Sequence, residues 1–143
     1  MRERHLMSSF SLDPKLAADT TELTRWSLSR VLLMNDSNFP WLVLVPERPG
    51  LVDFHDLASA DLAEATAEIV RASQALQTVF QPHKLNVAAL GNVVRQLHIH
   101  IVARFTSDAA WPRPVWGVVP AKPYGDAERG AMAARLKQAL ARA

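Results

Sequence analysis

The sequence contains no cysteine among its 143 residues. Disulfide bonds, thiolate metal ligands and a cysteine nucleophile are therefore excluded. Apolar residues make up 49% of the chain, which is enough to build a substantial core. Because this length suits one compact domain and leaves little room for a second, we predict a single domain over residues 1–143.

The sequence also lacks a strong charge of one sign and a long apolar run. Sixteen Lys and Arg residues stand against fourteen Asp and Glu residues, for a net charge of +2, and they are spread along the whole chain. In a dedicated nucleic-acid-binding protein the Lys and Arg residues are clustered. We therefore expect no nucleic-acid partner and only a weak preference for anionic small molecules. No apolar run approaches the length of a membrane span, and the segment 1–7 lacks the apolar core of a signal peptide. We therefore expect a cytoplasmic protein without a membrane partner.

Hydrophobic patterning predicts an α+β chain with an antiparallel sheet. Strands are predicted at 24–34 (one strand, or two with a break near Ser27), 41–45, 85–90 and 93–105. Gly91-Asn92 is predicted to be a hairpin turn between the last two strands. Apolar residues at helical spacing predict the main helix, which begins with Ser59 as N-cap and ends before Pro82. Further helices are predicted to start at Asp13-Pro14 and to span 126–141. The order of two strands, a helix, two strands and a trailing helix is typical of the α+β class.

Three polar residues alternate with apolar ones in the last predicted strand. Gln96, His98 and His100 are expected to share one face, because successive side chains of a strand point to opposite faces. A sheet holds its side chains more rigidly than a loop does, which suits nucleophilic catalysis. An ordinary imidazole pKa of about 6.5 leaves much of the ring neutral at physiological pH. The pattern therefore predicts that one histidine attacks phosphorus while the other donates a hydrogen bond to a phosphoryl oxygen.

The same strand is open to two other interpretations. Alternation is ordinary amphipathic structure, and two histidines on a wet face can be accidental. Histidines two residues apart on a strand can also chelate zinc, but they need further ligands. Arg104 falls on the histidine face, where a cation opposes a metal, and His5, His55 and His83 lack ligand spacing. We therefore expect no metal site.

The segment 96–102 resembles the signature of the histidine triad (HIT) superfamily, in which three histidines alternate with apolar residues. The similarity extends to 33–36, 41–46, 85–87, 91–94 and 111–116, so it covers most of the chain from about Leu32 to Trp116. The whole sequence is especially similar to bacterial HIT proteins that are labelled diadenosine tetraphosphate hydrolase-like. The resemblance implies a HIT-like antiparallel sheet of about five strands, with one main helix and a C-terminal helix. It also implies a homodimer in which the two sheets are joined.

The resemblance assigns roles to the triad positions. The central histidine of the family, which is the nucleophile, falls on His98, and the third, which contacts a phosphate oxygen, falls on His100. The first histidine is replaced by Gln96. Glutamine donates and accepts hydrogen bonds but cannot carry a proton away, so an orienting role survives there and an acid–base role does not.

Other positions match substrate-binding residues of the family. Asn35 or Asp36 matches a ribose contact, with turn chemistry as the alternative, and Asn92 matches a phosphate contact, with a hairpin role as the alternative. Asn86 is expected to hold the hairpin and is also a candidate substrate-binding residue. Trp111 resembles the C-terminal loop that shapes the pocket. Trp116 belongs to the same loop, where a hydrophobic clasp is slightly favoured over a pocket role.

The implied activity is that of a nucleotide hydrolase. His98 would attack the α-phosphorus of a dinucleoside polyphosphate or a nucleoside phosphoramidate, and water would then release a nucleoside monophosphate from a nucleotidyl-histidine intermediate. This scheme requires no cofactor. Three alternatives stay open: nucleotidyl transfer to an acceptor other than water, nucleotide binding by a regulator without turnover, and a metal-dependent enzyme.

Overall fold

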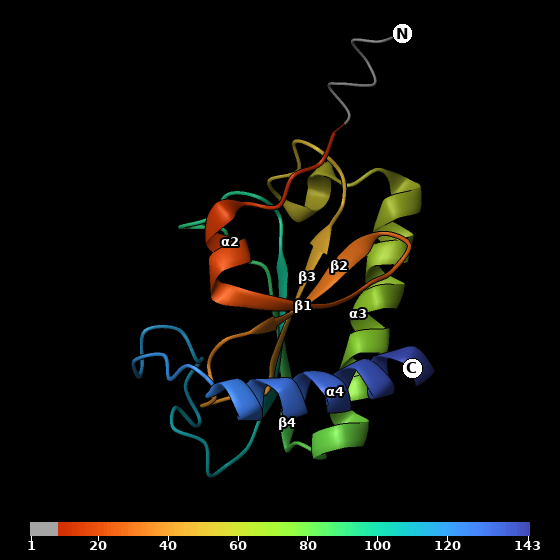
Figure 1. The fold of residues 1–143 in the computed structure, drawn as a ribbon. Helices are drawn as coiled ribbons and strands as arrows, with labels where there is room; N and C mark the ends of the chain where they lie inside the picture. Colours follow the sequence, from red (N-terminus) through yellow and green to blue (C-terminus); the bar gives the residue numbers. More distant parts are fainter. Residues whose placement is uncertain (1–8) are drawn as a thin grey trace, which may run out of the picture.

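The computed structural model describes residues 9–143, which form a five-stranded antiparallel sheet with helices on both sides (Figure 1). In the spatial order β1-β2-β3-β5-β4, the strands are β1 (Thr20–Arg25), β2 (Ser29–Met34), β3 (Trp41–Pro46), β5 (Ile99–Arg104) and β4 (Lys84–Ala88). The predicted α+β class and five-stranded sheet are confirmed. The segment 1–7, for which no signal peptide is predicted, and His5 within it lie outside the described residues.

The first predicted strand is two strands. The chain reverses between β1 and β2, and the backbone N–H of Trp26 donates to the carbonyl of Ser29 across the turn, at 2.9 Å. The break thus falls around Ser27, as the two-strand alternative predicted. β3 is buried at all six of its positions because both faces of the sheet are covered there, which explains its continuous apolar sequence.

Two long helices cover one face of the sheet. The helices of the described chain are α2 (Pro14–Asp19), the short 3-10 turn η1 (Phe54–Asp56), α3 (Ser59–Phe80) and α4 (Asp126–Arg142). α3 and α4 lie on the same side of the sheet (Figure 1) and share a core with its inner face. That core includes Leu33, Leu42, Leu44, Ile99 and Ile101 from the sheet, Ala72 and Leu76 from α3, and Leu136 and Leu140 from α4. No helix within residues 9–143 is long and apolar enough to cross a membrane.

The boundaries of α3 differ slightly from the prediction. Ala58 is the N-cap and Ser59 the first helical residue, so the predicted capping role of Ser59 is wrong; no side chain caps this end. At the other end, Gln81 adopts a left-handed conformation with φ of 50° directly before Pro82. Pro82 follows immediately and cannot continue the helix.

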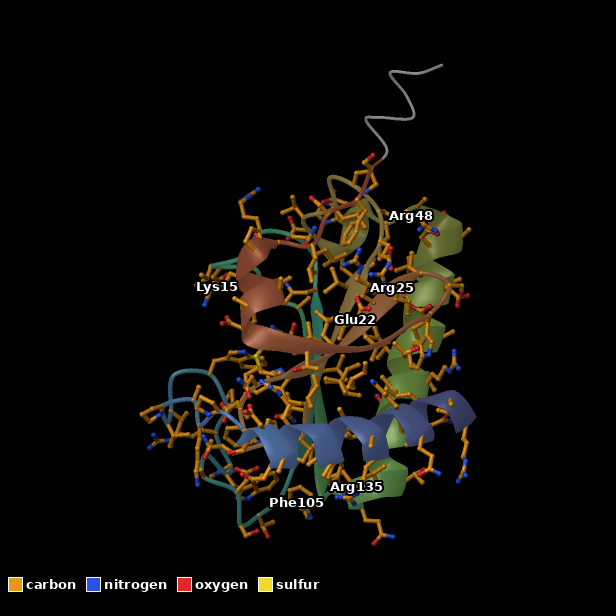
Figure 2. The ribbon with its side chains drawn as sticks, viewed as in Figure 1. Lys15, Glu22, Arg25, Arg48, Phe105 and Arg135 are labelled. Carbon is orange, nitrogen blue, oxygen red and sulfur yellow. The ribbon has the colours of Figure 1, made fainter. Side chains whose placement is uncertain are left out.

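The opposite face of the sheet carries a second, smaller core. Sheet residues Leu32, Trp41, Val43, Val45 and Val102 are covered there by Leu16 of α2 and by Ala110 and Val115 from the segment after β5. α2 lies on the other side of the sheet from α3, and Lys15 projects from it away from α3 and α4 (Figures 1 and 2). This face therefore has a thin and partly irregular cover.

The last two predicted strands do pair antiparallel, as β4 and β5, but the tight turn predicted between them at Gly91-Asn92 is wrong. β4 ends at Ala88, which pairs with His100, so residues 89–98 form a loop and β5 begins only at Ile99. Gly91 has a positive φ of 78°, but Asn92 does not. The residues before β5 are bonded elsewhere: the backbone N–H of Leu97 donates to the carbonyl of Leu51, outside the sheet.

Candidate functional site

His98 lies at the entry to β5 and is only 7% exposed. Its Nδ1 is 2.7 Å from the backbone carbonyl oxygen of Gln96. A carbonyl oxygen can only accept, so Nδ1 carries the proton and Nε2 keeps its lone pair. One backbone hydrogen bond thus leaves His98 with the ring nitrogen that a nucleophile needs.

His100 is held in the opposite tautomer. The indole N–H of Trp41, which can only donate, lies 3.0 Å from Nδ1 of His100. The proton of the neutral ring is therefore on Nε2. Burial, with a smaller effect from the neighbouring His98, lowers the pKa of His100 to about 4. His100 is consequently neutral near pH 7 and offers an N–H donor.

The two imidazoles lie side by side among aromatic rings. Their ring centroids are 4.8 Å apart, which confirms that they share a face of the sheet. Trp41 and Trp116 pack edge-to-face against His100, with centroids at 5.6 and 5.1 Å, and against each other at 5.9 Å. Such contacts restrict the His100 ring on several sides.

A cavity of about 330 Å³ opens beside both histidines. Its walls come from α2 (Lys15, Leu16 and Asp19), from Met34 and Trp41, from the loop 90–94, and from Trp116. A second cavity of about 520 Å³ adjoins His98 and is lined mainly by apolar side chains, including Val52, Phe54, Leu62, Leu90 and Leu97. His98 therefore borders both cavities, whereas His100 borders only the smaller one.

Gln96 lies in the loop before β5, and its side chain is fully engaged elsewhere. Its amide nitrogen donates to the carbonyl of Ser11, and its amide oxygen accepts from the N–H of Asp13, both at 2.8 Å. The Gln96 side chain thus holds the chain segment that precedes α2, and Gln96 lines neither cavity.

The predicted ribose contacts are also engaged in the protein. Asp36 is 6% exposed, and its Oδ1 accepts from the backbone N–H groups of Asn38 and Lys122. The Oδ1 of Asn35 accepts from the backbone N–H of Tyr124 at 2.9 Å. Neither residue lines the cavity beside the histidines. These contacts correspond to the turn alternative and extend it, because both side chains anchor the segment that leads into α4.

Asn86 and Trp111 lie together at the far end of β5. Asn86 accepts from Arg104 at 2.8 Å, and Trp111 stacks on the same guanidinium with its ring centre 5.6 Å away. Arg104 also forms a buried ion pair with Asp108 at 2.8 Å. This cluster supports the segment after β5 and contributes no residue to the wall of the histidine cavity. Of the predicted binding residues outside the triad, the cavity wall includes Asn92.

Several cavity residues were not identified from the sequence. Lys15 and Asp19 come from the short first helix, and Trp41 was interpreted only as part of a buried strand. The spacing of Lys15 and Asp19 places them on one face of α2, where they form an ion pair at 2.8 Å. Nothing in that spacing indicates proximity to His98. Within residues 9–143, no group of three or more His, Cys, Asp or Glu side chains is arranged to hold a metal ion.

Comparison with known proteins agrees with this fold. The HIT domain profile matches residues 15–107, and the chain belongs to the HIT family. A histidine triad protein from Bradyrhizobium japonicum is 45% identical, with a TM-score of 0.90, and the alignment covers 92% of this chain and 98% of that one. A histidine triad protein from Marinobacter aquaeolei is 40% identical, with a TM-score of 0.91 and coverage of 94% and 98%.

A third solved structure, a histidine triad protein from Sinorhizobium meliloti, is 39% identical with a TM-score of 0.88, covering 92% of this chain and 98% of that one. No curated protein matched the chain. Members of the HIT family bind nucleotides and are often hydrolases.

Proposed function

We propose that this protein is a nucleotide hydrolase in which His98 is the nucleophile. The observation that carries the proposal is the tautomer of His98, whose Nδ1 is bonded to the Gln96 carbonyl while Nε2 is left with its lone pair beside a cavity. The substrate class is a dinucleoside polyphosphate or a nucleoside phosphoramidate, as the family resemblance implies.

The proposed reaction has two displacements. Nε2 of His98 attacks the α-phosphorus, a P–N bond forms, and the bond from phosphorus to the leaving group breaks. The leaving group departs with the bonding electrons and takes up a proton. Water then attacks the same phosphorus, the P–N bond breaks with its electron pair returning to Nε2, and the water gives up a proton to solvent as a nucleoside monophosphate is released.

His100 is proposed to stabilise the charge that builds on the phosphoryl oxygens. Its Nε2–H is the donor, because Nδ1 is occupied by the indole N–H of Trp41. With a pKa of about 4, this ring acts as a neutral donor and not as an acid. Asn92, in the wall of the same cavity, is a second candidate for a phosphate contact.

The test is a panel of nucleoside phosphoramidates and dinucleoside polyphosphates, assayed with the wild type, His98→Ala and His83→Ala. His83 is exposed and lies outside both cavities, so it serves as the matched control. We expect His98→Ala to lose at least about a thousandfold in kcat, and His83→Ala to keep wild-type turnover. Wild-type turnover by His98→Ala would overturn the assignment.

Two further measurements separate the alternatives. Mass spectrometry of a quenched reaction is expected to place a nucleotidyl adduct on a peptide that contains His98. Product analysis with added alcohols or amines distinguishes hydrolysis from transfer. A transferase would join the nucleotidyl group to the added alcohol or amine, whereas a hydrolase would release the nucleoside monophosphate. A regulator without turnover would bind a nucleoside monophosphate and convert none of the substrates.

A further inference from the structure

We infer that Gln96, at the position of the missing triad histidine, is a positioning residue that holds α2 against the substrate cavity and thereby sets substrate affinity. This inference rests on the proposed function. It assigns no catalytic role to Gln96, because its amide contacts only the backbone of Ser11 and Asp13.

The Gln96 amide contacts the segment before α2 through two hydrogen bonds, and we call this pair of bonds the clip. An amide carries a donor and an acceptor on one carbon, and here the donor meets the carbonyl of Ser11 while the acceptor meets the N–H of Asp13. Both distances are 2.8 Å, and the partners are more than eighty positions away in sequence. A side chain that only donates or only accepts cannot make both bonds.

Asp13 transmits the clip to α2. Its backbone N–H is bonded to Gln96, while its side chain caps the helix by accepting from the N–H of Lys15 at 2.8 Å. Its carbonyl accepts the first helical bond, from Ala17. Gln96 is therefore hydrogen-bonded to Asp13, the residue at which the helix begins.

α2 in turn forms one wall of the cavity. Lys15, Leu16 and Asp19 line it together with His98, His100 and the loop 90–94. Leu16 is 4% exposed and belongs to the second core, and β1 begins directly after the helix. Loss of the clip is thus expected to loosen the amino-terminal end of α2 without unfolding the protein.

The test compares Gln96→Leu and Gln96→Glu with the wild type. Leucine removes both hydrogen bonds at similar volume, whereas glutamate keeps the acceptor but places a carboxylate oxygen against the carbonyl of Ser11. Gln138→Leu, an exposed glutamine of α4, is the matched control. We expect KM for a nucleoside phosphoramidate to rise about tenfold in both Gln96 variants, with kcat within about twofold of wild type. The control should leave both constants unchanged.

A second readout is independent of turnover. Backbone amide exchange is expected to accelerate at Asp13 and along α2 in Gln96→Leu, and not in Gln138→Leu. The Kd for a nucleoside monophosphate should rise in parallel with KM.

A large fall in kcat with unchanged KM would place Gln96 in the chemical step and overturn the inference, as would unchanged exchange at Asp13. If the wild type neither binds nor converts any nucleotide, the proposed function and the affinity role both fail. The amide exchange experiment would in that case still decide whether the clip itself exists.

Discussion

His98 and His100 are chemically identical side chains two residues apart, yet single hydrogen bonds give them opposite tautomers. The backbone carbonyl of Gln96 keeps the proton of His98 on Nδ1, and the indole of Trp41 keeps the proton of His100 on Nε2. One ring is left with a lone pair and the other with a donor. This division of roles follows from the two partners, because the Gln96 carbonyl can only accept a hydrogen bond and the Trp41 indole N–H can only donate one.

The depressed pKa of His100 predicts a pH-dependent loss of stability. Because the folded pKa is about 4 and the ordinary value is 6.5, the unfolded chain binds more protons between these limits. The contribution of the neutral His100 ring to the free energy of unfolding is complete above about pH 6.5, and it is lost as the pH falls towards 4. The loss amounts to roughly 3 kcal/mol for this group.

We expect His100→Gln to lose less stability than the wild type between pH 7 and pH 4, measured by urea unfolding at a series of pH values. Glutamine does not titrate, and its amide oxygen can still accept from Trp41. His83→Gln is the control and should follow the wild-type pH curve, because His83 is exposed. Identical pH curves for the wild type and His100→Gln would contradict the burial argument.

At the scale of elements, the segment after β5 depends on a buried ion pair. The Arg104 and Asp108 side chains are 2% and 4% exposed and meet at 2.8 Å. Burial alone would raise the pKa of Asp108, but hydrogen bonds from Arg104 and from the backbone N–H groups of Phe105 and Ala110 lower it to about 2. The carboxylate therefore organises the turn that leads to Trp116 and the cavity.

Asp108→Asn is expected to destabilise the protein by about 3 kcal/mol, because it leaves the Arg104 guanidinium buried without its counter-charge. The free energy of unfolding in urea measures this. Asp126→Asn is the matched control, since Asp126 pairs with Arg129 while its own side chain is 97% exposed. The control should change stability by less than about 0.5 kcal/mol. Equal losses of unfolding free energy in the two variants would show that the buried ion pair contributes no more to stability than the exposed one.

At the scale of the whole molecule, β4 is one of the two edge strands of the sheet within the described chain. β4 pairs with β5 only, and exposed apolar side chains lie on and beside it, with Val87 at 48%, Leu90 at 46% and Val93 at 81% exposure. A free edge with apolar neighbours is a natural site for strand pairing with another copy. The homodimer with joined sheets stays a prediction, as does the assignment of residues 1–143 to one domain.

If the dimer forms through β4, Val87→Glu combined with Val93→Glu should convert it to monomer in analytical ultracentrifugation. Val70→Glu, on α3, is the control, because Val70 is 50% exposed and lies away from the β4 edge. A monomeric wild type, or a dimer that survives the double substitution, would contradict the prediction.

The sequence predicted well what depends on neighbours in the chain. Alternation placed His98 and His100 on one face, apolar spacing located α3, and the triad signature indicated the family. It predicted poorly where loops replace strands. The tight turn at Gly91-Asn92 is wrong although its two strands pair, and residues close before β5 bond to distant parts of the chain: Leu97 to Leu51, and Gln96 to Ser11 and Asp13.

The sequence by itself therefore determined the element order, the shared face of the two histidines and the family. Only the tertiary structure decided which polar side chains are free to meet a substrate. Asp36 is bound to the N–H of Lys122, Asn35 to that of Tyr124, and Gln96 to Ser11 and Asp13. Lys15 and Asp19 were brought to the cavity by the same folding. The physical reason is that a hydrogen-bonding group has few bonds to make, and partners more than eighty residues away determine whether any remain.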